Sequence, residues 1–262
     1  MTLNSLSGRC MFVWRLAPVI KAEMDVATFV RKAKAAHLGG VWIKIADGDG
    51  PFDNVRQPNL PLFEQVRDGL RAEGIAVWGW QVPYGGSVEH AKHEALVCAG
   101  LADQLKLDGV LMDAEGGKGY FTGGAPAAEA YASTLRDRMA ATGRGLAMCG
   151  NDIPGNFDNY PFAAFVKYAA FNAPQVYYGG SPSVVNRLSR AIEANKSVKL
   201  PFIPVGAGWV GPDGGCASAS ACAERAREFL RLVKEHQFTG HSFWHWMGVP
   251  AALWEVLFEI KP

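Results

Sequence analysis

The sequence has almost no excess of charge of either sign. Its 262 residues include 26 Lys and Arg against 25 Asp and Glu, a formal net charge of +1. No run of Lys and Arg exceeds two residues, so the electrostatic footprint of a nucleic-acid binder or polybasic membrane anchor is missing. No apolar segment approaches 18 uninterrupted residues, the length that a membrane-spanning helix needs. We therefore expect neither nucleic acid nor the core of a bilayer as a partner.

Signatures of metals and cofactors are also scarce. His90 and His93, like His241 and His245, lack the spacing of a metal site. The first apolar run is not followed by the glycine-rich G-x-G-x-x-G turn that binds dinucleotides. We expect no catalytic metal and no cofactor.

Cysteine is rare, and the sequence begins without the pattern of a secretory signal. Residues 1–20 lack the order of basic, long apolar and small-residue segments that export requires, so we expect synthesis in the cytoplasm and leave the final location open. Release to a cell wall by a non-classical route is compatible with this. The five cysteines are expected to be buried thiols, although Cys216 and Cys222 could form a local disulfide in an exported protein.

Eight short apolar runs alternate with amphipathic stretches along the chain, and their starts lie about 28 to 40 residues apart. The expected strands are Met11–Arg15, Gly40–Ala46, Ala76–Val82, Gly109–Asp113, Gly145–Cys149, Pro174–Tyr178, Pro201–Val205 and Ser242–Trp246. The expected helices are Asp25–His37, Pro61–Glu73, Val88–Lys106, Pro126–Thr142, Tyr160–Ala170, Val184–Asn195, Ser218–His236 and Pro250–Ile260. No linker divides the chain, so the pattern predicts an α/β fold, a single (β/α)8 TIM barrel over residues 1–262.

Two carboxylates at the end of the fourth predicted strand are the strongest chemical signal. Asp113 and Glu115 are two residues apart, so on a strand they project from one face about 6–7 Å apart. Barrel enzymes carry their chemistry at the carboxyl ends of the strands. Two carboxylates in a partly dry site raise the pKa of one of them, which can then act as a general acid. The alternative is that both are solvated acids at a strand end.

Aromatic and polar residues at the other strand ends form a candidate substrate groove. Indole rings can stack on sugar rings, although tryptophan also fills barrel cores. The candidates for substrate binding are Trp14, Asp47, Trp80, Gln81, Asp152, Gln175, Tyr178, Trp209, Trp244 and Trp246. Lys44, which lies among apolar residues of the second strand, is expected to form an ion pair with a barrel acid. A Schiff-base role for Lys44 is the alternative.

The segment Asp108–Glu115 resembles the DGxxxDxE pattern of family 18 glycoside hydrolases, the chitinases and their plant chitinase-lysozyme relatives. Leu111 stands where many members have an additional Asp, while Gln175-Val-Tyr177 and Trp244 are similar to a Q-x-Y motif and a sugar-site tryptophan. The resemblance implies that Glu115 protonates the glycosidic oxygen. It also implies that Asp113 and Tyr177 hold the substrate's acetamido group, whose carbonyl oxygen attacks the anomeric carbon.

A second resemblance covers other segments. Gly40–Gly48 is similar to the second strand of family 25 lysozymes, as are Val77–Tyr84 and a D-x-E on the fourth strand. Those lysozymes begin with an acid in the first strand, where this chain has Phe12–Arg15, and usually carry another on the last, where it has Phe243–Trp246. The two resemblances agree on barrel, carboxylates and substrate class, and differ on bond and mechanism.

The sequence therefore predicts a monomeric glycoside hydrolase that acts on a polysaccharide of N-acetylated amino sugars, with bacterial cell-wall glycan ahead of chitin. Two alternatives remain open. One is a catalytically inactive barrel that binds glycans or proteins, since a fold can persist without its activity. The other is a lyase or aldolase that uses Lys44.

Overall fold

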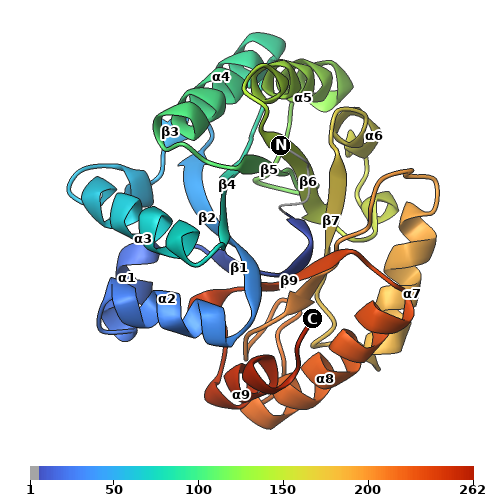
Figure 1. Ribbon diagram of the computed structural model, residues 1–262. Coiled ribbons are helices and arrows are strands. Elements are labelled where there is room, and N and C mark those ends of the chain that lie inside the picture. The colour runs from blue at the N-terminus through green and yellow to red at the C-terminus, as the bar shows by residue number, and fades with distance from the viewer. Residues whose placement is uncertain (1–5) are drawn as a thin grey trace.

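Eight parallel strands close into a barrel in the computed structural model of the protein, which describes residues 6–262 (Figure 1). The barrel strands are β1 (Gly8–Val13), β2 (Leu38–Asp47), β4 (Ala76–Val82), β5 (Gly109–Asp113), β6 (Gly145–Asn151), β7 (Phe171–Val176), β8 (Val205–Ala207) and β9 (Gly240–Trp244). The first strand pairs with both β2 and β9, which closes the sheet. A short strand, β3 (Gly50–Pro51), pairs antiparallel with the end of β2. The predicted (β/α)8 barrel is confirmed.

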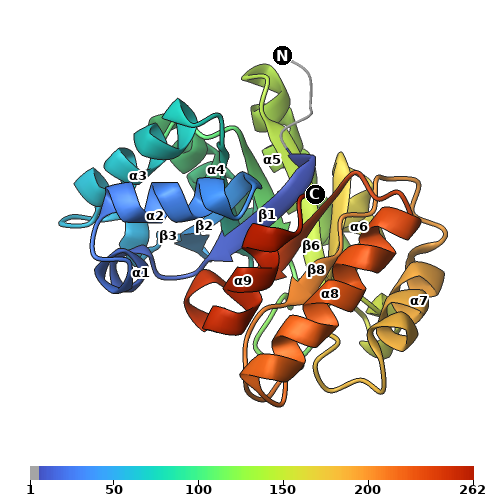
Figure 2. The same cartoon turned by 60° about the horizontal axis from the view of Figure 1, so that its bottom comes forward.

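Helices surround this barrel in both views (Figures 1 and 2). They are α1 (Leu16–Ala22), α2 (Val26–Ala35), α3 (Leu60–Ala72), α4 (Val88–Gln104), α5 (Gly124–Ala141), α6 (Phe162–Val166), α7 (Val184–Asn195), α8 (Ala219–Glu235) and α9 (Ala251–Glu259). The side chains of Asp25, Ser87, Ser183 and Ser218 accept hydrogen bonds from backbone N–H groups in the first turns of α2, α4, α7 and α8. No helix among residues 6–262 is long and apolar enough to span a membrane.

Alternation along the strands divides the core into two apolar layers. On β5, Val110 and Met112 pack in the outer layer under the helices, whereas Leu111 lies in the barrel interior. The interior also holds the large rings of Trp42 and Trp78. Glycines make room for these rings, because a Cβ at Gly109 or Gly145 would lie 2.5 or 2.2 Å from the Trp78 indole.

Six of the eight barrel strands differ from the predicted limits at one end or both, and only β4 and β5 match at both ends. The sixth and eighth barrel strands, β7 and β9, begin and end before the predicted limits, at Val176 and Trp244. The seventh, β8, begins at Val205 rather than at residue 201. Pro201 and Pro204 lack the backbone N–H that a strand ladder needs, so regular pairing starts only after them. Helix α1, between the first strand and α2, is not among the predicted helices.

Candidate active site

A pocket of about 330 Å³ lies at the carboxyl ends of the barrel strands. Its walls come from β5, β6, β7, β9 and the loops that follow β5 and β8. The lining residues are Asp113, Glu115, Tyr120, Asn151, Gln175, Tyr177, Trp209, Asp213 and Trp244. Six of these nine are residues that the sequence predicts for the site. The pocket therefore brings together side chains from positions 113 to 244 of the chain.

Asp113 and Glu115 share one hydrogen-bond donor in this pocket. The side-chain amide nitrogen of Gln175 donates to Asp113 Oδ1 at 3.1 Å and to Glu115 Oε1 at 3.2 Å. Asn151 holds the backbone directly after Glu115, because its Oδ1 accepts a hydrogen bond of 2.7 Å from the backbone N–H of Gly116. The two carboxylates therefore lie close together, and side chains from β6 and β7 hold the segment that carries them.

The environment favours protonation of this pair of carboxyl groups. Burial and the charge of Glu115 raise the pKa of Asp113, against smaller opposing contributions from Cys149, Lys44 and Gln175. Burial also raises the pKa of Glu115, while the hydrogen bonds from Gln175 and Asn151 oppose the rise. Two close carboxyl groups, Asp113 buried and Glu115 half-buried, cannot both ionise easily, so the pair retains a proton well above the usual pH range of a carboxylic acid. Such a pair can serve as a general acid near neutral pH.

Aromatic rings form the other side of the pocket. The rings of Tyr177 and Trp209 meet edge to face with centroids 5.0 Å apart. Trp244 packs over the barrel interior, with its centroid 5.4 Å from Phe12 and 6.5 Å from Trp14. Trp14 is 40% exposed at the end of β1, so an aromatic surface continues from the pocket toward that strand.

The loop between β8 and α8 carries Trp209 and Asp213 into the pocket. A disulfide joins Cys216 to Cys222, with their Cα atoms 5.3 Å apart, so the bond that the sequence left open is present. The backbone N–H of Cys216 also donates to Trp209 O at 2.7 Å. The disulfide and this hydrogen bond tie the end of the loop to helix α8 and to Trp209.

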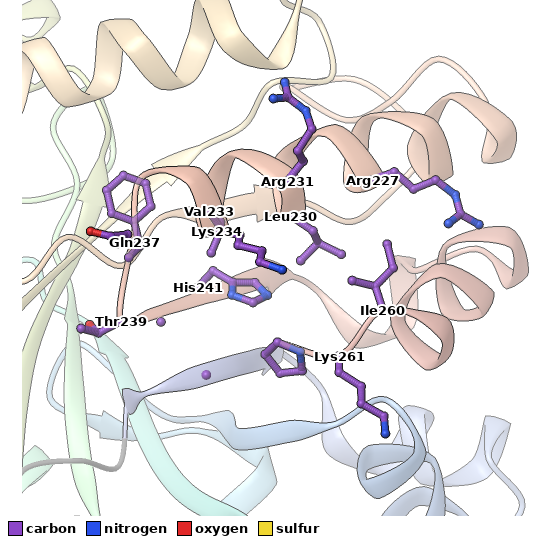
Figure 3. Close-up of a pocket in the computed structure, with 14 residues that line it drawn as sticks. Arg227, Leu230, Arg231, Val233, Lys234, Gln237, Thr239, His241, Ile260 and Lys261 are labelled. Atoms are coloured by element: carbon purple, nitrogen blue, oxygen red, sulfur yellow. The ribbon is translucent and has the colours of Figure 1, made fainter.

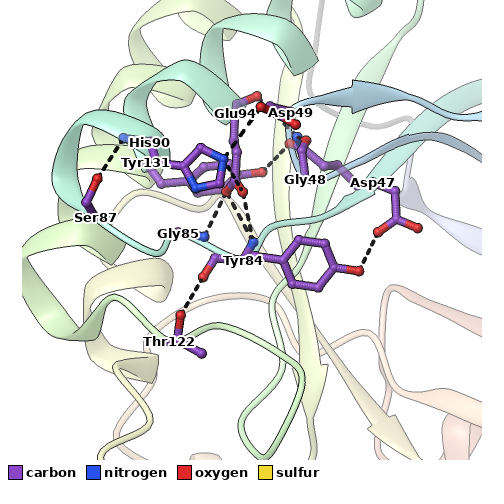
Figure 4. Close-up of polar contacts among 11 residues, drawn as sticks. Asp47, Gly48, Asp49, Tyr84, Gly85, Ser87, His90, Glu94, Thr122 and Tyr131 are labelled. Carbon is purple, nitrogen blue, oxygen red and sulfur yellow. Dashed lines mark hydrogen bonds and ion pairs between the residues drawn. The ribbon is translucent and has the colours of Figure 1, made fainter.

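A polar network fixes the rim between β2 and β4 (Figure 4). Asp47 accepts hydrogen bonds from the Tyr84 hydroxyl at 2.7 Å and from Lys44 Nζ at 2.8 Å. Tyr84 itself is held by its backbone N–H, which donates to the buried Glu94 carboxylate at 3.1 Å. The backbone N–H of Thr122 donates to Tyr84 O at 3.0 Å. This network therefore connects Asp47 to the loop that carries Glu115.

Neither a protein-family model nor a curated protein sequence matches this chain. Solved structures do match it. The Bacillus cereus spore cortex-lytic enzyme SleL aligns with 98% of this chain and 74% of its own, at 11% identity and a TM-score of 0.67. A Chromobacterium violaceum chitinase aligns with 96% of this chain and 98% of its own, at 10% identity and a TM-score of 0.65.

A GH18 chitinase from Pseudoalteromonas aurantia aligns with 91% of this chain and 94% of its own, at 13% identity and a TM-score of 0.58. The chain has the (β/α)8 fold of the GH18 chitinases. At this identity the likeness concerns the course of the backbone, and the chemistry of the site has to be argued from its residues.

Within this barrel, two predicted substrate-binding residues point away from the pocket. Tyr178 is fully buried in the outer layer, where its ring lies 5.3 Å from that of Phe229 on α8. Asp152 is buried beyond the end of β6 and accepts a hydrogen bond of 2.6 Å from Arg187 on α7. Each follows an inward-facing neighbour, Tyr177 or Asn151, so alternation of the backbone sends it toward the helices.

Three further candidates are also buried away from the pocket. Trp80 is 1% exposed inside the barrel, where its Nε1 donates to Val13 O and Trp42 O at 3.3 and 3.2 Å. Trp246 lies beyond the end of β9 and stacks on Phe29 of α2 with centroids 4.1 Å apart. Gln81, which follows Trp80, faces the helices instead of the barrel. These residues support the scaffold and do not line the candidate site.

Gln81→Ala is expected to lower the stability of the fold by about 2–4 kcal/mol without changing the activity of each folded molecule. The Gln81 amide donates to Gly48 O at 2.6 Å and Glu94 O at 3.1 Å, and accepts from the Tyr131 hydroxyl at 2.6 Å. The alanine variant leaves these buried groups unpaired. Urea denaturation and initial rates would measure the two effects, with exposed Gln104→Ala as the control. A raised KM with unchanged stability would contradict the assignment.

The structure adds three residues to the predicted site: Tyr120, Asn151 and Asp213. Alternate residues of a strand face the same side, and Ala147 and Cys149 of β6 face the barrel interior. Asn151 is the next residue in that series, so alternation could have identified it. Tyr120 and Asp213 lie on irregular loops, where no periodic pattern indicates the direction of a side chain. Among residues 6–262, no group of three or more His, Cys, Asp or Glu side chains is arranged to hold a metal ion.

Proposed function

We propose that the protein is a glycoside hydrolase that cleaves a polymer of N-acetylated amino sugars, with bacterial cell-wall glycan ahead of chitin as substrate. The observation that carries the proposal is the close pair of the buried Asp113 and the half-buried Glu115, joined by the Gln175 amide and facing an aromatic wall. A proton held by a raised pKa supplies the acid, and the aromatic wall supplies a surface for a sugar ring.

In the proposed reaction, Glu115 donates a proton to the glycosidic oxygen as the bond to the anomeric carbon breaks. The carbonyl oxygen of the substrate's own acetamido group attacks that carbon, so no protein nucleophile is needed. Asp113 and the Tyr177 hydroxyl orient the acetamido group. The Glu115 carboxylate then takes a proton from water, which adds to the anomeric carbon and restores the acetamido group.

The aromatic surface next to the pocket offers places for further sugar units. Trp14 and Trp209 flank Trp244, and Asp47 lies on the rim at the end of β2, held by Lys44 and Tyr84. A polymer that enters the pocket with one sugar ring could contact these residues with the next. In this proposal, Lys44 positions Asp47 and takes no part in the bond cleavage.

Incubation with defined glycans tests the proposed activity. The purified protein is expected to release reducing sugars from peptidoglycan or from chitin oligosaccharides, with products identified by mass spectrometry and the cleaved bond read from the new reducing end. A protein that cleaves neither polymer in the range of pH 4–8 would contradict the proposal.

One observation favours a catalytically inactive glycan-binding barrel as a second candidate. Leu111 lies below Asp113 in the barrel interior, where many family 18 enzymes carry a further Asp, and the neighbouring Cys149 is a thiol. Asp113 therefore has no second aspartate beneath it. Retention of the protein on insoluble glycan without any cleavage would support this second candidate.

A further inference from the structure

A second cavity lies at the end of the barrel opposite the carboxylates (Figure 3). It has a volume of about 540 Å³ and borders the amino-terminal ends of β1 and β9, the last turns of α8 and the segment after α9. Asp113 and Glu115 are instead at the carboxyl ends of the strands. Whatever binds this cavity therefore does not touch the candidate active site.

The walls of this cavity are largely apolar. Leu230 and Val233 on α8 are buried and line it, together with Phe238 and Ile260. Figure 3 shows Leu230 and Ile260 directed into the same space. A volume of this size matches the sites of small organic molecules, which combine apolar walls with a few polar groups.

Four of the cavity's polar side chains are cationic, and those of Gln237 and Thr239 can both donate and accept hydrogen bonds. Its lining includes Lys234 but no Asp or Glu. Arg227 and Arg231 are already engaged in ion pairs with Glu259 and Glu235. Lys234 forms none of the ion pairs found among residues 6–262, and its side chain points toward His241 in Figure 3. Lys234, an exposed residue at the edge of this space, thus has no carboxylate side chain as an ion-pair partner among residues 6–262.

His241 also lines the cavity. Its Nε2 accepts a hydrogen bond of 3.4 Å from the Nε–H of Arg9, whose guanidinium is fixed by the carbonyl oxygens of Ala36, Leu257 and Ile260. Burial and the Arg9 charge lower the pKa of His241 to about 3, so the ring is neutral. With Nε2 accepting, the single ring proton is on Nδ1. The buried imidazole therefore offers an N–H group and no second acceptor.

We propose that this cavity binds a small organic anion, with its carboxylate or sulfonate group at Lys234 and His241 and its apolar body against Leu230, Val233 and Ile260. Charge-assisted hydrogen bonds from the ammonium and imidazole groups select the anion, and burial of the apolar body supplies the remaining affinity. The proposal goes beyond the proposed glycosidase activity and does not depend on it.

Two fluorescent dyes of similar shape test the proposal. The first is 8-anilinonaphthalene-1-sulfonate, an apolar anion, and the second is its uncharged analogue N-phenyl-1-naphthylamine. Titration of the whole protein is expected to show tighter binding of the anion. Lys234→Glu should weaken the binding of the anionic dye by about tenfold or more. It should change the affinity for the neutral dye by less than about twofold. Val233→Trp, which fills the cavity, should weaken the binding of both dyes.

Lys21→Glu is the matched control, because Lys21 is an exposed lysine on α1, outside the cavity. It makes the same charge change and should leave both affinities unchanged. Circular dichroism would establish that each variant is folded. Equal binding of the two dyes, or equal effects of Lys234→Glu and Lys21→Glu on the anion, would overturn the proposal whatever the result with glycans.

Discussion

Glu115→Gln is expected to reduce kcat for glycan cleavage by about 10²–10⁴-fold, the usual contribution of a general acid. Glutamine has nearly the same shape and can still present an oxygen to the Gln175 amide, which now donates to Glu115 Oε1 at 3.2 Å. It has no proton to give to the glycosidic oxygen. Binding of an uncleaved oligosaccharide should therefore remain within about threefold of the wild type, since the aromatic wall is unchanged.

Initial rates and calorimetric titration with a chitin oligosaccharide would separate these two effects. Glu89→Gln is the matched control, because Glu89 is an exposed glutamate in the first turn of α4 and makes the same chemical change outside the pocket. An unchanged kcat in Glu115→Gln would rule out Glu115 as the acid. A loss of binding as large as the loss of rate would show that the residue holds the substrate.

Asp113→Asn is expected to have opposite effects on rate and stability. The rate should fall by about 10²–10³-fold, because the variant loses both the proton that the Asp113–Glu115 pair shares and the carboxyl oxygen that accepts the acetamido N–H. The melting temperature should rise at neutral pH, because the wild type places an ionisable carboxyl group in a buried site beside Glu115 and the variant does not. For a domain of this size, each kcal/mol corresponds to about 2–4 °C.

The sign of the pH dependence follows from the raised pKa of Asp113. The folded protein holds the proton more tightly than the unfolded chain, so the stabilisation is complete below the unfolded pKa of about 3.9 and is lost as pH rises through the folded pKa. The difference in melting temperature between Asp113→Asn and the wild type should therefore grow with pH. Scanning calorimetry from pH 4 to 8 measures it. A difference that shrinks with increasing pH would contradict the raised pKa.

The sequence alone determined the barrel and the position of the carboxylates. Eight alternations of apolar runs and amphipathic stretches predict the fold because each unit must bury one face, and that requirement is local. The two-residue spacing of Asp113 and Glu115 likewise predicts that both side chains face the same way, and both line the pocket although β5 ends at Asp113. Neither inference needs a contact between distant parts of the chain.

Only the tertiary structure decided which strand-end residues meet. The Gln175 side chain on β7 reaches the carboxylates across the intervening strand β6, and Asp213 enters from a loop about a hundred residues from Asp113. The depth of Trp80 in the barrel and the outward turns of Tyr178 and Asp152 depend on strand ends and stagger, which long-range pairing sets. Residue spacing determines to which face of a strand a side chain points. The pairing of eight strands into a closed barrel determines which other side chains lie next to it.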